Sequence, residues 1–403
     1  MKVSLTLVLL FSCFAQAADW PTYLGPEKNG IVQEKVRTDW SKEAPKVLWK
    51  ADLGRGCSSF AVADGLVLTM GNSGKIETIW CFVAATGKIK WKDSYEEDLA
   101  PKFYTGGPGA TPTIDGDRVY TLSKSGRLNC YELSTGTLQW TQHLKDDLGG
   151  KPPTWGYSTA PFIDGEELLV MPCGKGSSLV ALDKKTGKEL WKSAHQARAG
   201  YTLPVLANYR GAKTAFIFHG RNLAAYNLEK KGELLFEFEW RTPYDVNATS
   251  PVFYEDMLYI ASGYGMGYAV LDLSGKEPKI LHRDRERRMI FQNAILKKGD
   301  LIGVFGDKNI DAEAFRMDMK TGKLKWSVKI PGTRASTLMA GDQLIILSES
   351  GELIFGKDTG TAFQETSRHQ ILKKLCWAAP AISEGRLFVR NNGGEMVCLD
   401  LSK

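Results

Sequence analysis

A short string, Thr-Gly followed four residues later by Trp, recurs along the chain and constrains its fold more than any other feature. Complete copies end at four tryptophans: Trp91, Trp140, Trp191 and Trp326. Weaker copies contain three further glycines: Gly232, Gly275 and Gly360. Successive glycines of the series lie 38 to 51 residues apart. A period of this length indicates a repeat architecture, in which each unit buries its apolar surface against its neighbours.

A second marker precedes each Thr-Gly string. It consists of a small residue or Pro, an apolar pair and an Asp-Gly-like turn, and its clearest copies are at 112–116 and 161–165. Degenerate copies begin at six positions: Phe60, Pro204, Pro251, Ala294, Leu338 and Pro380. Each unit therefore contains four short strands, which is the composition of a β-propeller blade. The eight units predict an all-β fold, an eight-bladed β-propeller of four-stranded antiparallel blades.

The two ends of the chain supply complementary parts of one blade. Residues 397–401 resemble the strand before a Thr-Gly turn, and no Trp strand follows them. The unmatched Trp strand lies at 47–50. We therefore expect the ring to close by pairing of the N-terminal strand with the C-terminal blade, which leaves no open blade at the seam. The alternative is that Trp49 is a core residue of a lead-in segment. The predicted domains are a signal peptide (1–17), a lead-in segment (18–45) and the propeller (46–403).

The first residues have the features of a secretory leader. Lys2 precedes an apolar run over 3–14, and Ala15-Gln16-Ala17 has the small-x-small form of a cleavage site. The run is too short for a transmembrane helix. A lipoprotein anchor at Cys13 is the alternative, but the residue before Cys13 is not small. We expect an exported protein, periplasmic or extracellular and not transmembrane, that is a monomer.

Charge and cysteine usage narrow the function further. The formal net charge of +6 is modest and both signs are interspersed, so nucleic-acid binding is not expected. Cys81, Cys130 and Cys398 occupy equivalent strands of different blades, too far apart for a disulfide. Only Cys57 and Cys376, at the first and last blades, could form a bridge. The five histidines show no zinc-ligand spacing, and no metal site is predicted.

The loops that enter the innermost strands form the candidate site. The two turn types cap one face of the propeller, so the longer and more variable loops lie on the other. Ten of their residues are candidates for ligand binding: Arg55, Trp155, Tyr157, Tyr201, Asp245, Asn247, Gln292, Asn293, Arg334 and Trp377. Aromatic rings stack on flat or sugar-like ligands, while arginines and amides hold anionic or hydroxylated groups. The alternative is structural, with small and hydroxyl residues crowding the axis and aromatics packing between blades.

The densest charge cluster of the sequence is a separate candidate. The run 282–288 carries alternating signs and is interpreted as a solvated loop, with a basic contact for an acidic partner as the alternative.

The repeat also resembles a known family. The string Leu-Asp-x-x-Thr-Gly-Lys-x-x-Trp at 182–191 is similar to the repeat of quinoprotein (PQQ-like) eight-bladed propellers, and the resemblance covers nearly all of the chain from Trp20. This family includes PQQ-dependent dehydrogenases and the propeller subunit of the outer-membrane β-barrel assembly machinery, a non-catalytic scaffold. Many of the dehydrogenases hold a disulfide between adjacent cysteines and a Ca²⁺ ion on Glu, Asn and Asp. This chain has no Cys-Cys pair, and its loops offer little beyond Asp245 and Asn247.

The resemblance therefore implies two functions. The first is a non-catalytic binding or scaffold module in cell-envelope or outer-membrane protein assembly, with no cofactor, whose loops bind an extended protein segment or a glycan. The alternative is a PQQ-dependent oxidoreductase acting on an alcohol or sugar, with PQQ bound with or without Ca²⁺. In that alternative Asp245 would be the base, Asn247 a metal or quinone contact, and Arg55 or Arg334 a partner of the quinone.

Overall fold

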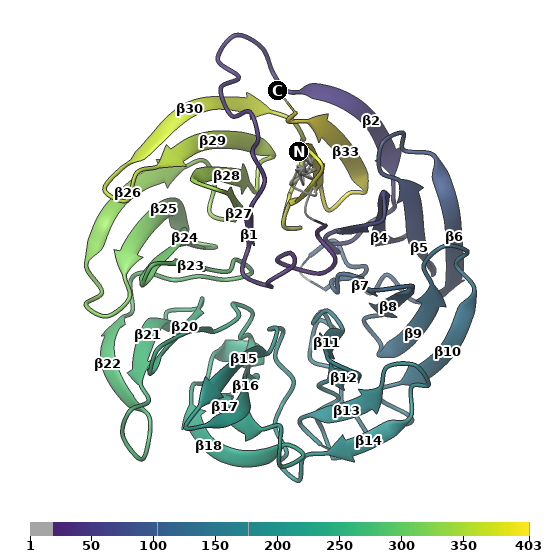
Figure 1. The fold of residues 1–403 in the computed structure, drawn as a ribbon, viewed down its shortest axis with the longest axis vertical. Coiled ribbons are helices and arrows are strands. Elements are labelled where there is room, and N and C mark those ends of the chain that lie inside the picture. The colour runs from purple at the N-terminus through teal and green to yellow at the C-terminus, as the bar shows by residue number, and fades with distance from the viewer. Residues whose placement is uncertain (1–18, 103, 176, 403) are drawn as a thin grey trace, which may run out of the picture.

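The computed structural model describes residues 19–102, 104–175 and 177–402, so the predicted signal peptide and Cys13 lie outside the described residues. Eight antiparallel sheets are arranged in a ring around a central axis (Figure 1). Each blade has four antiparallel strands in sequence order from the axis outward, except that the last blade takes its outer strand from the N-terminal part of the chain. One sheet gains a fifth strand, β1 (Ile31–Val32), which pairs parallel with its innermost strand. The predicted eight-bladed propeller is confirmed.

The strands of the first four blades are short near the axis and longer outside. They are β3 (Ala61–Ala63), β4 (Leu66–Asn72), β5 (Ile76–Val83) and β6 (Ile89–Glu96); β7 (Thr113–Asp115), β8 (Arg118–Leu122), β9 (Arg127–Glu132) and β10 (Leu138–His143); β11 (Phe162–Asp164), β12 (Glu167–Val170), β13 (Val180–Asp183) and β14 (Glu189–Lys192); and β15 (Val205–Tyr209), β16 (Ala212–Phe218), β17 (Asn222–Asn227) and β18 (Glu233–Glu239).

The next three blades follow the same order, and a single-turn 3₁₀ helix, η1 (Pro243–Asp245), precedes them. Their strands are β19 (Val252–Tyr254), β20 (Met257–Ser262), β21 (Gly267–Asp272) and β22 (Lys279–Asp284); β23 (Ile295–Lys297), β24 (Asp300–Asp307), β25 (Ile310–Asp318) and β26 (Leu324–Ile330); and β27 (Ala335–Ala340), β28 (Gln343–Ser348), β29 (Glu352–Asp358) and β30 (Phe363–Gln370). The last blade contains β31 (Ala381–Ser383), β32 (Arg386–Arg390), β33 (Glu395–Asp400) and β2 (Lys46–Asp52).

The ring closes as the ends of the sequence predict. Strand β2 pairs antiparallel with β33, with Trp49 opposite Cys398, and Figure 1 shows it as the outermost strand of that blade. A fully buried arginine, Arg390, ties the same blade to the first one. Its guanidinium donates to the carbonyl oxygens of Met70 at 2.6 Å and Gly54 at 3.0 Å. Burial lowers the pKa of Arg390 to about 10.

The repeated tryptophans and glycines meet between neighbouring blades. The Trp91 indole N–H donates to the carbonyl oxygen of Leu133 in the next blade at 2.7 Å, and Gly136 of that blade lies against the ring. Trp49 with Gly87 and Trp140 with Gly187 repeat both contacts at other interfaces. We call this contact the Trp–Gly clasp. In every blade the two outermost strands shift register at a β-bulge, which lies beside the position that the Trp occupies in the complete repeats.

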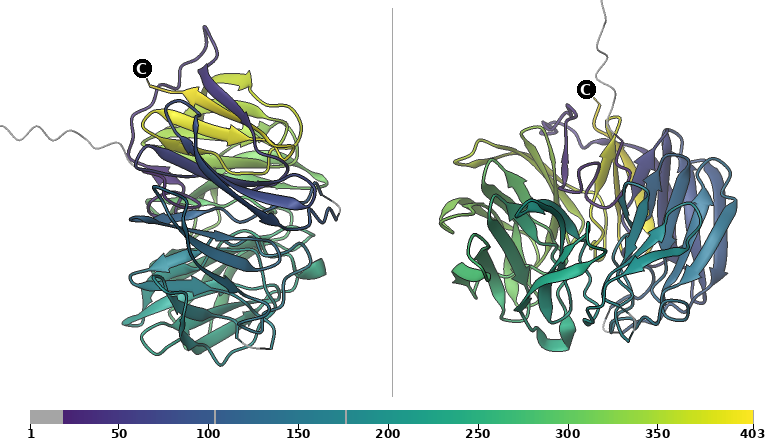
Figure 2. Two further views of the ribbon diagram at one scale, coloured as in Figure 1. Left: turned by 90° about the vertical axis from the view of Figure 1, so that its right-hand side faces the viewer. Right: turned by 60° about the horizontal axis from the view of Figure 1, so that its bottom comes forward.

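The N-terminal segment crosses one face of the disk. This face, which carries the Asp-Gly and Thr-Gly turns, is called the turn face, and the opposite one the loop face. Residues 19–45 run across the turn face (Figures 1 and 2), where Trp20 pairs with Val62 and β1 (Ile31–Val32) pairs parallel with β27. Tyr23 reaches into the axis and its hydroxyl accepts a hydrogen bond from Asn293 at 2.8 Å. Burial raises the pKa of Tyr23 to about 12.

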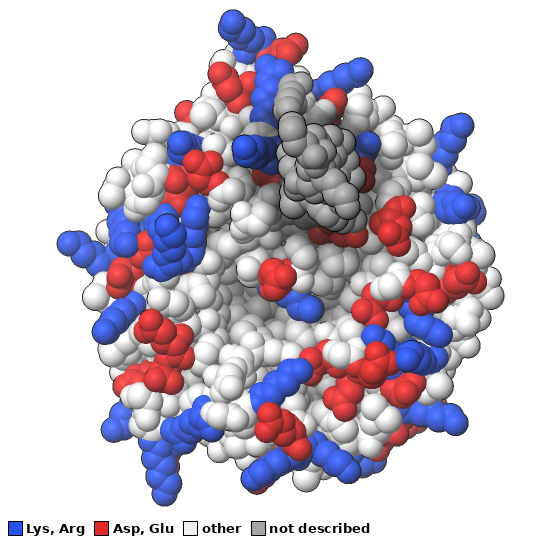
Figure 3. All heavy atoms as spheres, viewed as in Figure 1, with Lys and Arg blue, Asp and Glu red and all other residues white. Residues whose placement is uncertain are grey.

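The turn face shows no charge bias. Acidic and basic side chains are intermixed around its rim (Figure 3). The six cysteines of the described chain are all free, so the Cys57–Cys376 bridge does not form in this structure. Within the described ranges, no helix is long and apolar enough to cross a membrane.

One carboxyl group is buried in the first blade without a cation. Glu77 of β5 is inaccessible to solvent, and one of its oxygens accepts the Tyr95 hydroxyl at 2.6 Å. Its other oxygen has no partner among the described residues. Burial raises the pKa of Glu77 to about 8, because the charged form loses its hydration.

The clasp predicts a matched pair of glycine substitutions. Gly136 has φ +75°, and a Cβ there would lie 2.5 Å from the Trp91 ring, whereas Gly116 has φ +57° and nothing within 4 Å of its Cβ position. Gly116→Ala should cost about 1–2 kcal/mol for the left-handed backbone alone. Gly136→Ala should cost about 1–3 kcal/mol more, because the ring must move. Urea unfolding of both variants measures the difference in their free energies of unfolding. Equal losses of stability in the two variants would contradict the role of the clasp.

Glu77 predicts how stability depends on pH. Its pKa is higher in the folded than in the unfolded state, so its contribution is complete below about pH 4.5 and is lost as the pH rises to about 8. Glu77→Gln removes this loss, so the variant should gain stability relative to wild type as the pH rises across this window. Urea unfolding between pH 5 and 8.5 tests this. The control Glu96→Gln, at an exposed position, should show the same dependence of stability on pH as the wild type. If Glu77→Gln also shows the wild-type dependence, Glu77 is not the group responsible.

Candidate functional site

The loop face is the face left open for a ligand, because the N-terminal segment occupies the other one. Around its axial mouth stand seven aromatic side chains, contributed by different loops: Tyr104, Trp155, Tyr201, Tyr244, Tyr264, Phe291 and Trp377. We call this set the aromatic rim. The ring centroid of Trp155 lies 6.3 Å from the centroids of both Tyr201 and Tyr244, and the centroids of Tyr244 and Tyr264 are also 6.3 Å apart. On the other side Phe291 and Trp377 are 5.2 Å apart.

Several rim residues are held in an unfavourable backbone conformation. Tyr244, Tyr264 and Phe291 have φ of 65°, 57° and 70°, a region that bulky side chains rarely adopt. Such strain persists only where the surroundings enforce it, and it gathers at functional sites. Here it leaves Tyr244 69% exposed, the most exposed large hydrophobic side chain of the described chain.

Asp245 fastens the strained turn that carries Tyr244. Its carboxylate accepts from Arg221 Nε at 2.6 Å and Arg198 Nη1 at 2.9 Å, and Asp245 itself has φ 60°. Two charge-assisted hydrogen bonds to one carboxylate fix the turn between two neighbouring loops. The role of Asp245 in this structure is to position Tyr244.

A buried lysine fastens another rim loop. Lys124 Nζ donates to the carbonyl oxygens of Leu99 and Ala100 and to the Tyr104 hydroxyl, each at 3.1 Å. Burial lowers the pKa of Lys124 and raises the pKa of Tyr104. The lysine thus anchors the long loop between β6 and β7.

An arginine lies between the remaining two rings. The Arg334 guanidinium is 5.6 Å from the Phe291 centroid and 5.5 Å from the Trp377 centroid. Its Nη1 contacts Glu349 Oε2 at 3.2 Å. Burial opposes ionisation of Glu349, but hydrogen bonds from Thr333 and the charge of Arg334 outweigh it and hold the pKa of Glu349 below its usual value.

The structure divides the ten predicted site residues. Trp155, Tyr201, Arg334 and Trp377 belong to the mouth, and Asp245 supports it. Arg55 is exposed at the seam between the last and first blades. The other four are Tyr157, Asn247, Gln292 and Asn293.

Three of these four make structural hydrogen bonds. Tyr157 is buried and donates to the Pro172 carbonyl oxygen at 2.6 Å. Asn247 is inaccessible, donating to His219 O and accepting from Ser262 Oγ. Asn293 joins the Ser250 backbone N–H to Tyr23. These three residues are therefore structural, as the alternative interpretation of the loops expects. Gln292 is also buried, and only its oxygen is paired.

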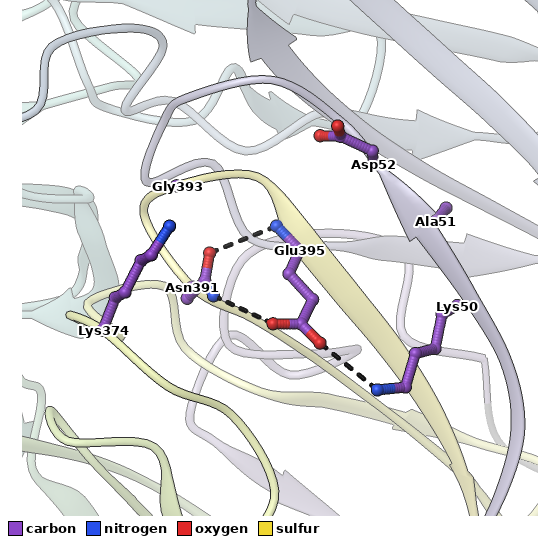
Figure 4. A pocket seen from close by; sticks show the side chains of 7 residues that line it. All are labelled: Lys50, Ala51, Asp52, Lys374, Asn391, Gly393 and Glu395. Atoms are coloured by element: carbon purple, nitrogen blue, oxygen red, sulfur yellow. Dashed lines mark hydrogen bonds and ion pairs between the residues drawn. The ribbon is translucent and has the colours of Figure 1, made fainter.

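Two shallow clefts adjoin each other on the loop face at the seam, with volumes of about 430 and 390 Å³. Figure 4 shows the first, where Glu395 accepts from Lys50 and Asn391 while Lys374 extends toward Gly393. The second includes Arg55, Asn72 and Leu99. Asp52 and Gly393 line both clefts, and Lys374, which lines the first, belongs to the loop that carries Trp377.

Sequence reasoning missed four rim aromatics and one histidine cluster. Tyr104, Tyr244, Tyr264 and Phe291 carried no repeat signal, and only their position in variable loops could have indicated them. His195 and His219 both contact the Tyr226 hydroxyl, at 2.7 and 2.8 Å. Burial, and then His195, lower the pKa of His219 to about 3.

The residues do not fit the calcium-bound quinone that the dehydrogenase resemblance implies. Asp245 is paired with two arginines, and the side chain of Asn247 is fully used by core hydrogen bonds. Across 19–102, 104–175 and 177–402, no group of three His, Cys, Asp or Glu is placed to hold a metal. We therefore derive no chemical step through this cofactor.

Solved structures with the same fold come from proteins of different functions. BamB from Moraxella catarrhalis has a TM-score of 0.63 at 16% identity, covering 89% of this chain and 100% of that one. Quinohemoprotein alcohol dehydrogenase from Comamonas testosteroni has a TM-score of 0.69 at 12% identity, covering 96% and 81%. Sqt1 from Saccharomyces cerevisiae has a TM-score of 0.61 at 10% identity, covering 92% and 100%. At these identities the likeness shows the fold alone.

The family comparison is more specific. No curated protein sequence matches this chain. Residues 77–328, more than half of the chain, match a family model, PQQ_2, described as outer membrane protein assembly factor BamB. The matched region runs from β5 to β26 and contains all four complete Thr-Gly…Trp strings. The chain thus belongs to this PQQ-like family of β-propellers.

Proposed function

We propose that this protein is a non-catalytic binding propeller of the cell envelope, acting in outer-membrane protein assembly, and that its aromatic rim holds an extended segment of a partner protein. The observation that carries the proposal is the rim itself, in which three aromatic residues are held at positive φ and the turn that carries Tyr244 is fastened by the ion pairs of Asp245. Large rings supply contact area with little loss of side-chain entropy, as in protein-binding surfaces.

Ring orientation favours a protein segment over a glycan. Trp155 is inclined by 54° to Tyr201 and 84° to Tyr244, and Tyr244 by 68° to Tyr264. These neighbouring rings form no common flat platform on which a row of sugars could stack. Rings inclined to one another in this way suit the separate side chains of an extended chain better. Family membership and the predicted leader support a place in the envelope.

Photocrosslinking tests the rim directly. A photoreactive p-benzoylphenylalanine at Tyr244 should yield a covalent adduct with an envelope protein in the source organism, because this ring is exposed at the mouth. The matched control is Leu190, which is 49% exposed on the outer strand near the turn face. Trp155→Ala should reduce the Tyr244 adduct severalfold. Equal adducts at both positions, or none at Tyr244, would contradict the proposal.

A further inference from the structure

The side of the rim formed by Phe291 and Trp377 has a chemistry of its own. The Arg334 guanidinium lies between the two rings, and only its Nη1 is engaged, with Glu349 and Thr333. Its Nε and Nη2 make no hydrogen bond with a described residue, so the Nε–Nη2 edge has no acceptor. A guanidinium edge of this kind matches the two oxygens of a carboxylate.

Two buried amides beside the same rings also lack an acceptor. Gln292, next to Phe291, is 3% exposed and its Nε2 is unpaired. Asn392 is 1% exposed; its oxygen accepts the Trp377 backbone N–H at 3.1 Å, and its Nδ2 is unpaired. The three unsatisfied groups around this pair of rings are therefore all donors. A buried unpaired donor is costly, so the cluster favours a ligand rich in acceptors.

The neighbouring loop adds positive charge and apolar surface. Lys373 and Lys374 are exposed, and neither pairs with an acidic group of the described chain. Lys374 extends into the cleft of Figure 4, and Leu375 is 41% exposed beside it. Among the described residues, Glu349 is the carboxylate within ion-pair distance of Arg334, and it engages Nη1, not the Nε–Nη2 edge.

We propose that Arg334, between Phe291 and Trp377, is a carboxylate-binding subsite that recognises an acidic group of the partner segment next to an apolar side chain. This inference rests on the proposed function and adds to it the chemistry of the partner. The carboxylate could belong to an Asp or Glu side chain or to a chain terminus.

Three peptides, each labelled at the N-terminus with an uncharged boron-dipyrromethene dye, separate these sources. The first is Gly-Ser-Gly-Leu-Phe with a free C-terminus, the second is its C-terminal amide, and the third is the amide of Gly-Ser-Asp-Leu-Phe. Fluorescence polarisation with the mature protein should show at least tenfold tighter binding of a carboxylate peptide than of the neutral amide, since charge-assisted hydrogen bonds are the strong ones. The first peptide reports a terminal carboxylate and the third a side-chain carboxylate. Higher salt should reduce the preference.

Matched variants assign the effect to Arg334. Arg334→Gln should remove the preference, so that the carboxylate peptides bind no more tightly than the neutral amide, while Trp377→Ala weakens all three peptides. Glu349→Gln should strengthen carboxylate binding, because the resident negative charge is gone while its oxygen can still accept from Thr333. A melting temperature equal to that of the wild type shows that a variant is folded. If Arg334→Gln melts at a lower temperature, the peptide preferences of Arg334→Lys and Glu349→Gln decide the test instead.

The outcomes separate the subsite from the proposed function. Equal binding of all three peptides, a preference that survives Arg334→Gln, or no binding at millimolar peptide overturns the carboxylate subsite. The proposed function would still stand if Tyr244 gave its crosslink. Loss of the Tyr244 adduct together with a retained peptide preference would instead overturn the protein-binding role and keep the subsite.

Discussion

The Trp–Gly clasp between neighbouring blades is the interaction on which this ring depends. Five blades present a ring side chain from the outer strand to the glycine of the next blade's turn: Trp49, Trp91, Trp140, Trp191 and His282. Where the clasp is complete, the indole N–H donates to the carbonyl oxygen two residues before the Thr of the Thr-Gly turn. His282 repeats this geometry, with Nε2 2.9 Å from the Met319 carbonyl oxygen and Gly322 against its imidazole. Since the contact needs both a ring and a missing Cβ, it fixes residues in adjacent blades at once.

The clasp also determines which face can carry function. It holds the turns at one face to a common geometry, and the N-terminal segment closes that face further. At the blade that has Ser367 in place of a Trp, Trp40 of this segment docks, hydrogen-bonded to Ser367 and His369. The loops of the opposite face take no part in the clasp. The length and residues of these loops can therefore vary without opening the ring. They carry the aromatic residues at positive φ and Arg334, whose Nε has no hydrogen-bond acceptor among the described residues.

The sequence allowed the fold to be predicted almost completely, because the clasp leaves its period in the residues. Eight blades followed from the eight copies of the Asp-Gly-like marker, and the pairing of β2 with β33 followed from Trp49 and from the strand at 397–401. The path of residues 19–45 did not follow, because no repeat governs that segment, and so the insertion of Tyr23 at the axis was missed. The site was predicted in part. Trp155 and Tyr157 lie two residues apart in one loop, yet one lines the mouth and the other is core. That difference depends on the loop backbone, which no periodicity records.

Function of the loop face is the central claim, and genetic complementation tests it most directly. Cells of the source organism without this gene would receive either a triple alanine variant at Trp155, Tyr244 and Trp377 or one at the exposed turn-face residues Ile89, Leu138 and Leu190. The quantity to measure is the level of folded outer-membrane β-barrel proteins, with both variants shown to be folded. The account predicts that the turn-face variant restores the level and the loop-face variant does not. Restoration by the loop-face variant, or failure of the turn-face variant alone, would contradict it.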